Sequence, residues 1–71
     1  PNPAQHQLHI NTQQSITGLQ LLNSQGRQVA NLLPEPTQAL TVPLVAFAPG
    51  LYVARITFAN GTVGSYTFVK E

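Results

Sequence analysis

The chain has 71 residues, a formal net charge of +1 and 7% charged residues, against about 25% in an average domain. We expect one small domain over residues 1–71, with a core of aliphatic and aromatic side chains because there is no cysteine for a disulfide. The three cations lie far apart, which argues against nucleic acid, and no apolar stretch approaches the roughly 20 residues of a membrane span. Because the chain starts with Pro1, we expect it to be a piece of a longer protein.

Apolar and polar residues alternate along the first half of the chain, as in half-buried strands. Residues 7–12, 17–23 and 27–33 are three predicted strands. The second and third form a predicted hairpin, because the Asn-Ser-Gln-Gly run over residues 23–26 is typical of a tight turn. Gly26 can adopt the positive φ that this corner requires.

The middle of the chain contains prolines that limit strand pairing. Residues 34–36 are a predicted loop, because neither of its prolines can donate to a ladder. Residues 38–44 alternate again, but Pro43 confines this strand to an edge or to a short length. Residues 45–50 are a predicted turn region, with Phe47 as the anchor into the core.

The last 23 residues contain two runs of β-branched and aromatic residues on either side of Asn60-Gly61, a pair typical of hairpins with two-residue loops. With that loop Ala59 faces Thr62. Arg55 then faces Tyr66 as a predicted cation–π pair.

This register also predicts the two faces of the terminal hairpin. One face carries Tyr52, Ala54, Ile56 and Phe58 with Val63 and Val69, and the other carries Leu51, Val53 and Arg55 with Tyr66, Phe68 and Lys70. Only one face of a sandwich strand can point inward. The second face therefore exposes an apolar group of Leu51, Val53 and Phe68 to a partner.

About six to seven short strands with turn signals between them, and no helical pattern, predict an all-β sandwich. An exposed last strand with few charges could also pair edge to edge with a second copy, giving a homodimer of the isolated domain.

Residues suited to chemistry are scarce. His6 and His9 lie three apart, which on a strand sends them to opposite faces, and no aspartate or cysteine completes a metal site. Glu35 is the only internal carboxylate, so paired acid–base catalysis is excluded. We therefore expect no catalytic residues, no cofactor, no metal and no small-molecule substrate. The run from Asn60 to Thr62 matches an N-glycosylation acceptor, but a turn explains it better.

Taken together, three motifs resemble those of the C-terminal sorting domains of proteins exported by the type IX secretion system of Bacteroidota. The first is Pro1-Asn2-Pro3, and the second is the middle hairpin with Gly26, Arg27 and Val29. The third comprises Gly50-Leu51-Tyr52-Val53, Arg55-Ile56, Gly61 and Phe68-Val69-Lys70. The likeness covers essentially the whole chain.

The resemblance implies an immunoglobulin-like antiparallel β-sandwich that acts as a translocation signal and does no catalysis. It implies that the cargo passes through the periplasm, is recognised by an outer-membrane translocon, and is passed by a shuttle protein to a surface sortase. The domain is then usually removed, and the cargo remains at the cell surface or is secreted. Recognition is expected through the terminal hairpin, at Gly50, Leu51, Tyr52, Val53, Gly61, Tyr66, Phe68, Val69 and Lys70.

Two positions depart from the family pattern. Glu71 follows Lys70 where a second basic residue is common, and Gln25 precedes Gly26 where an acidic residue or asparagine is common. The alternative function is a non-catalytic immunoglobulin-like or fibronectin-like accessory module, or a carbohydrate-binding module, of an extracellular enzyme. Such a module would be expected to use exposed coplanar aromatic residues or a Ca²⁺ site, and with no tryptophan and no aspartate the chain offers neither.

Overall fold

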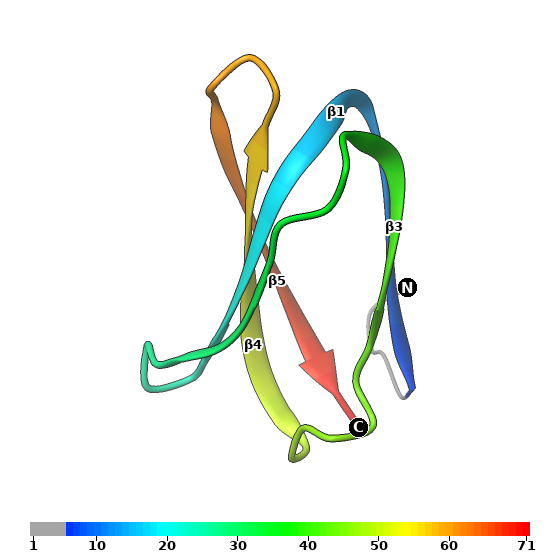
Figure 1. Cartoon of the computed structure of the whole chain (residues 1–71). Coiled ribbons are helices and arrows are strands. Elements are labelled where there is room, and N and C mark those ends of the chain that lie inside the picture. The colour runs from blue at the N-terminus through cyan, green and yellow to red at the C-terminus, as the bar shows by residue number, and fades with distance from the viewer. Residues whose placement is uncertain (1–5) are drawn as a thin grey trace.

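The computed structural model describes residues 6–71, which form five strands and no helix (Figure 1). The strands are β1 (Gln7–Asn23), β2 (Gln28–Leu32), β3 (Thr37–Pro43), β4 (Gly50–Phe58) and β5 (Val63–Lys70). They belong to one antiparallel sheet in the order β2-β1-β4-β5, with β3 paired to β1 beside that path. The predicted all-β class is confirmed. The motif Pro1-Asn2-Pro3 lies outside the described residues.

Strand β1 explains why the described residues contain five strands and not the expected six to seven. It is 17 residues long and includes both of the strands predicted over residues 7–12 and 17–23. Its pairing with β3 shifts register between Asn11 and Ile16, and its pairing with β4 shifts between Ile16 and Gly18. In Figure 1 the strand arches over at this level without interruption. Two predicted strands are therefore two halves of one bent strand.

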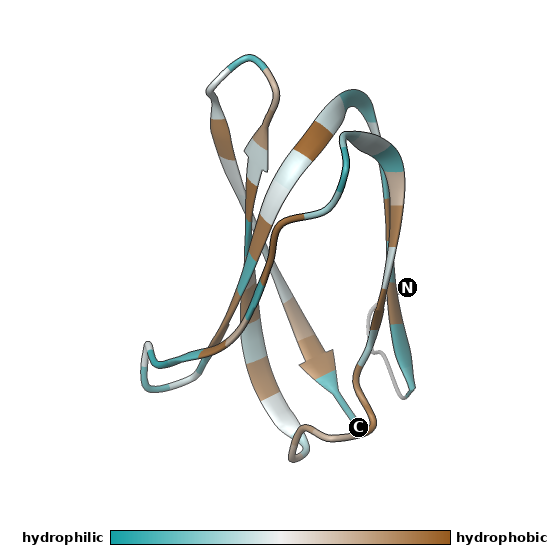
Figure 2. Cartoon of the chain, in the orientation of Figure 1, coloured by the Kyte–Doolittle hydropathy of each residue, from teal (hydrophilic) through white to brown (hydrophobic). Residues whose placement is uncertain are grey.

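The arch in β1 curves the sheet, so that one of its faces encloses the core. The first half of β1 lies beside β3, and the second half lies between β2 and β4 on the other side of the molecule (Figure 1). Apolar bands alternate with polar ones along the strands (Figure 2), and the inward side chains meet between the two halves. The buried core consists of Leu8, Ile10, Ile16, Leu19, Leu21, Val42, Leu44, Tyr52, Ala54, Ile56 and Phe68. No polar or charged side chain of residues 6–71 is buried.

The hairpin between β1 and β2 forms as predicted. Gly26 has a φ of 81°, and its N–H donates to the carbonyl of Asn23 at 2.9 Å. The Asn23 side-chain oxygen also accepts hydrogen bonds from the N–H groups of Gln25 and Arg27, each at 3.0 Å. Asparagine and glycine thus fix the corner from its two ends.

Pro43 lies where the sequence placed it, on a strand with a single neighbour, because β3 pairs with β1 alone. Leu44 N–H donates to the His6 carbonyl at 2.7 Å, and hydrogen-bonded pairs alternate along an antiparallel ladder. Pro43 faces Gln7, the next pair along, which exchanges no ladder hydrogen bonds. Its missing N–H therefore costs the sheet nothing.

Candidate functional site: the terminal hairpin

Strands β4 and β5 form the predicted terminal hairpin, but its loop differs from the prediction. Phe58 N–H donates to the Thr62 carbonyl and Gly61 N–H donates to the Phe58 carbonyl, both at 2.9 Å, so residues 59–61 form a three-residue loop. Gly61 has a φ of 89°, and no non-glycine residue among those described has a positive φ. The predicted two-residue loop would require positive φ at Asn60 as well. A type I turn followed by a glycine bulge takes its place.

The side chain of Asn60 accounts for this choice of loop. Its Oδ1 accepts hydrogen bonds from Thr62 N–H at 3.0 Å and from Thr62 Oγ1 at 2.7 Å. This is the local bonding by which asparagine stabilises a turn. The Asn-Gly pair thus marked the hairpin correctly, and the hydrogen bonds between Asn60 and Thr62 stabilise its three-residue loop.

The longer loop shifts the register of β5 by one residue, which moves every side chain of that strand to the opposite face. Arg55 faces Ser65, so the predicted cation–π pair with Tyr66 is wrong. Tyr52 faces Phe68, and Leu51 faces Val69. The prediction that Phe68 shares the exposed face with Leu51 and Val53 is also wrong, because Phe68 is buried with 0% exposure.

The inner face of the hairpin carries a row of aromatic rings. Phe68 stacks on Tyr52 with ring centroids 5.7 Å apart and on Tyr66 with centroids 6.3 Å apart. Phe47 contacts Tyr52 from the loop before β4, at 6.1 Å between centroids, and packs against the core as predicted. The Tyr52 hydroxyl donates to the Ala48 carbonyl at 2.6 Å. This row joins the loop to the sheet, and offset aromatic pairs of this kind add about 0.5–1.5 kcal/mol beyond their burial.

The outer face of the hairpin carries an apolar surface, which we call the outer patch and define as Leu22, Leu51, Val53 and Val69. Leu51 is 48% exposed and faces Val69, which is 40% exposed. Val53 is half-buried and faces Leu22 of β1, so the four side chains continue across three strands. The predicted apolar outer face is present, with Val69 in the position expected for Phe68.

Leu22 was missed by sequence reasoning, although a signal for it exists. Leu21 and Leu22 are consecutive in an alternating strand, so one of them must point away from the core. The structure buries Leu21 and leaves Leu22 on the outer face.

The structure divides the nine predicted recognition residues between different environments. Leu51, Val53 and Val69 belong to the outer patch, whereas Tyr52 and Phe68 lie in the core. Tyr66 points inward but remains 39% exposed, and Lys70 is half-buried at the end of β5 opposite Gly50. Gly61 forms the hairpin loop.

The middle-hairpin motif is divided in the same manner. Gly26 makes the turn, Arg27 is exposed beside it, and Val29 packs against the core.

The side chains suited to metal binding do not cluster in the described part of the chain. No three His, Cys, Asp or Glu side chains within residues 6–71 come together as metal ligands. His9 is exposed, and its Nδ1 lies 3.0 Å from the hydroxyl of Thr41. The part of the chain that the structure describes has no helix long and apolar enough to cross a membrane. What the hairpin does present is the exposed apolar outer patch.

The fold and the surface define the class as a small all-β domain with an exposed apolar patch on its terminal hairpin. The family model described as "Secretion system C-terminal sorting domain" matches residues 1–70, and the chain belongs to this family. It is thus a C-terminal sorting signal of type IX secretion, a role that implies interaction with that machinery and export to the cell surface or beyond. Comparison with curated proteins and with solved structures found no match.

Proposed function

We propose that the type IX translocon recognises this sorting domain through the outer patch on the β4–β5 hairpin. The observation that carries the proposal is the pairing of the family match with an apolar surface on its terminal motif. Leu51 and Val69 are large apolar side chains that remain 48% and 40% exposed, because only the opposite face of the hairpin packs against the core. Contiguous exposed apolar side chains, more than single ones, are typical of interaction surfaces.

Burial supports a division of labour among the expected recognition residues. Leu51, Val53 and Val69 supply contact area. Tyr52 and Phe68 pack the hairpin against the core, so they would affect recognition only indirectly, by stabilising the fold. Gly61 sets the register that turns Val69 outward.

The proposal extends to the order of events during export. The domain passes the periplasm with its cargo, the translocon engages it, and a shuttle protein delivers it to a sortase that removes it. It has no catalytic part in these steps. Lys70 and Glu71 follow Val69 of the patch, so a charge contact with the machinery would be made there.

The experiment is a fluorescent reporter that carries a cleavable signal peptide and these 71 residues at its C-terminus. It is expressed in a bacterium with type IX secretion and in a translocon-deficient strain. We expect the reporter outside the outer membrane in the first strain only. Periplasmic retention in both strains would contradict the sorting role, and equal release from both would mean that export does not use this route.

A further inference from the structure

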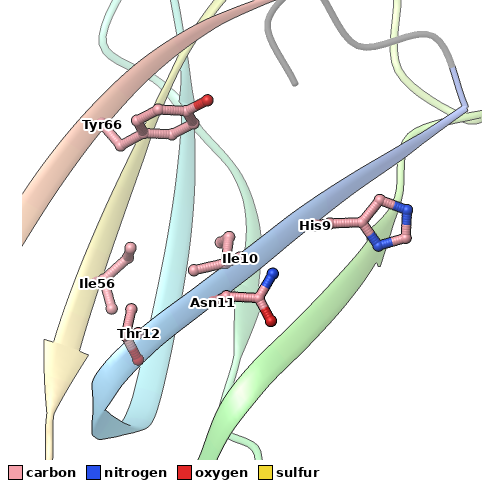
Figure 3. A pocket seen from close by; sticks show the side chains of 6 residues that line it. All are labelled: His9, Ile10, Asn11, Thr12, Ile56 and Tyr66. Carbon is pink, nitrogen blue, oxygen red and sulfur yellow. The ribbon is translucent and has the colours of Figure 1, made fainter.

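A second feature of the molecule lies between the first half of β1 and strand β5, on the inner side of the sheet. It is a cleft of about 290 Å³ lined by His9, Ile10, Asn11, Thr12, Ile56 and Tyr66. In Figure 3 Ile10, Ile56 and Thr12 point toward the space beside the Tyr66 ring, and His9 points away from it. The cleft separates two strands that are not hydrogen-bonded to each other.

Both walls of the cleft are strand edges. Strand β5 ends the path β2-β1-β4-β5, and residues 7–11 of β1 pair with β3 on their other side. Phe58 and Thr62 are a hydrogen-bonded pair, so alternation along the ladder turns the N–H and C=O groups of Ser65 and Thr67 away from β4. His6 and Leu44 are likewise a hydrogen-bonded pair of β1 and β3. Alternation from this pair turns the N–H and C=O groups of His9 and Asn11 away from β3.

The core is less well covered at this cleft than elsewhere. Ile10 and Ile56 are 7% and 6% exposed, whereas all other core residues except Tyr52 are at 2% or below. The lining contains no carboxylate, lysine or arginine. The volume lies just under the about 300–1,000 Å³ typical of small-molecule pockets, which favours one or two inserted side chains over a cofactor-sized ligand.

We propose that this cleft accepts an extended, uncharged segment of a partner protein, which adds to the β5 edge and inserts an aliphatic side chain between Ile10, Ile56 and Tyr66. The outward-pointing N–H and C=O groups of β5 favour an extended strand as the occupant, because a strand presents its own N–H and C=O groups at the same two-residue spacing. The apolar, uncharged lining defines the inserted side chain. This surface is separate from the outer patch, so the inference goes beyond the proposed recognition surface and does not depend on it.

The test is a titration of the 71-residue chain with the capped pentapeptide Thr-Val-Leu-Val-Thr, followed by NMR. A matched peptide with aspartate in place of leucine is the control. We expect saturable shifts at the methyl groups of Ile10 and Ile56, slower amide exchange at Ser65 and Thr67, and little response to the control peptide. Shifts at Leu51 and Val53 instead, or no saturation at millimolar peptide, would overturn the proposal.

Substitution at the edge provides a second arm. Ser65→Pro removes one edge N–H without removing a ladder bond, and Ser65→Ala keeps that N–H. We expect the proline variant to lose about tenfold or more in peptide affinity, equivalent to about 1.4 kcal/mol, and the alanine variant to bind as the parent. Equal binding by both variants would overturn strand addition. If the proline variant does not fold, the amide-exchange measurement on the parent chain decides between the two outcomes. Sedimentation without and with peptide tests for a second copy, since a dimer that the peptide dissociates would identify that copy, and not a partner protein, as the occupant of the cleft.

Discussion

Both faces of the β4–β5 hairpin carry large apolar side chains, but these side chains lie in different environments. The inner face places Tyr52 and Phe68 in the core, and the outer face leaves Leu51 and Val69 about half exposed. Both pairs lie directly opposite each other on the same two strands. The difference shows that hydrophobicity alone does not decide which side chains of this segment are buried. Burial depends on the face that each side chain occupies. For β5 that face is set by the length of the hairpin loop, which has three residues and not two.

The largest effect should come from Phe68, the largest fully buried side chain. Phe68→Ala removes its ring from the stacks with Tyr52 and Tyr66 and leaves a cavity, at an expected cost of about 3–5 kcal/mol. Because small domains have little stability to lose, we expect most of the chain to unfold. Chemical denaturation followed by circular dichroism measures this, and a fully folded variant with unchanged midpoint would contradict the packing described.

The next effect should come from the loop that sets the register. Gly61→Val places a β-branched residue at a φ of 89°, where no Cβ clash arises but the backbone conformation itself is strained. We expect a loss of about 1–3 kcal/mol in the free energy of unfolding. Gly61→Asn is the matched control, because asparagine tolerates this conformation better, and it should recover part of the loss. Equal stability of both variants would mean that the loop conformation does not constrain the hairpin.

A smaller effect is expected at the inner face when only a hydroxyl is removed. Tyr52→Phe keeps the ring stacked on Phe68 and deletes the hydrogen bond to the Ala48 carbonyl. The expected cost is about 0.5–1.5 kcal/mol. Thermal unfolding should show this as a lowered midpoint, with Tyr66→Phe as control since its ring is partly exposed. A midpoint equal to that of the parent would show that the loop before β4 is not held by this bond.

The outer face should give the smallest effect on stability. Leu51→Ser with Val69→Ser changes exposed side chains, and we expect a loss of about 1 kcal/mol or less. Thermal unfolding of the double variant checks this. A loss as large as that of Phe68→Ala would erase the distinction between the two faces.

Much of the fold could be predicted from particular residues. Gly26 marked the middle turn, Pro43 marked a strand with one neighbour, and Phe47 marked the anchor before β4, because each of these depends on local conformation or on a single residue's chemistry. The placement of Leu51 and Val53 on the outer face followed from alternation along the strand. The two-sheet immunoglobulin-like arrangement stays an expectation, since the described strands form one arched sheet.

Two features could not be predicted because they depend on more than local pattern. The polar residues 12–15 broke the apolar alternation, yet the backbone continues through them as one strand because its two halves pair with different neighbours. The Asn-Gly pair is compatible with two-residue and three-residue loops, and the hydrogen bonds from Thr62 to Asn60 favoured the longer one. One residue of difference in the loop exchanged Phe68 for Val69 on the outer face.

Truncation cannot test the recognition surface well, because removing residues 66–71 also removes Phe68 from the core. The most direct measurement is export of the reporter carrying Leu51→Ser and Val69→Ser, compared with Val63→Ser, which alters an exposed valine at the loop end of the same face. With the outer patch as the recognition surface, the double variant stays in the periplasm while folded, and Val63→Ser is exported as the parent is. Export of the folded double variant at the parent's level would contradict that assignment.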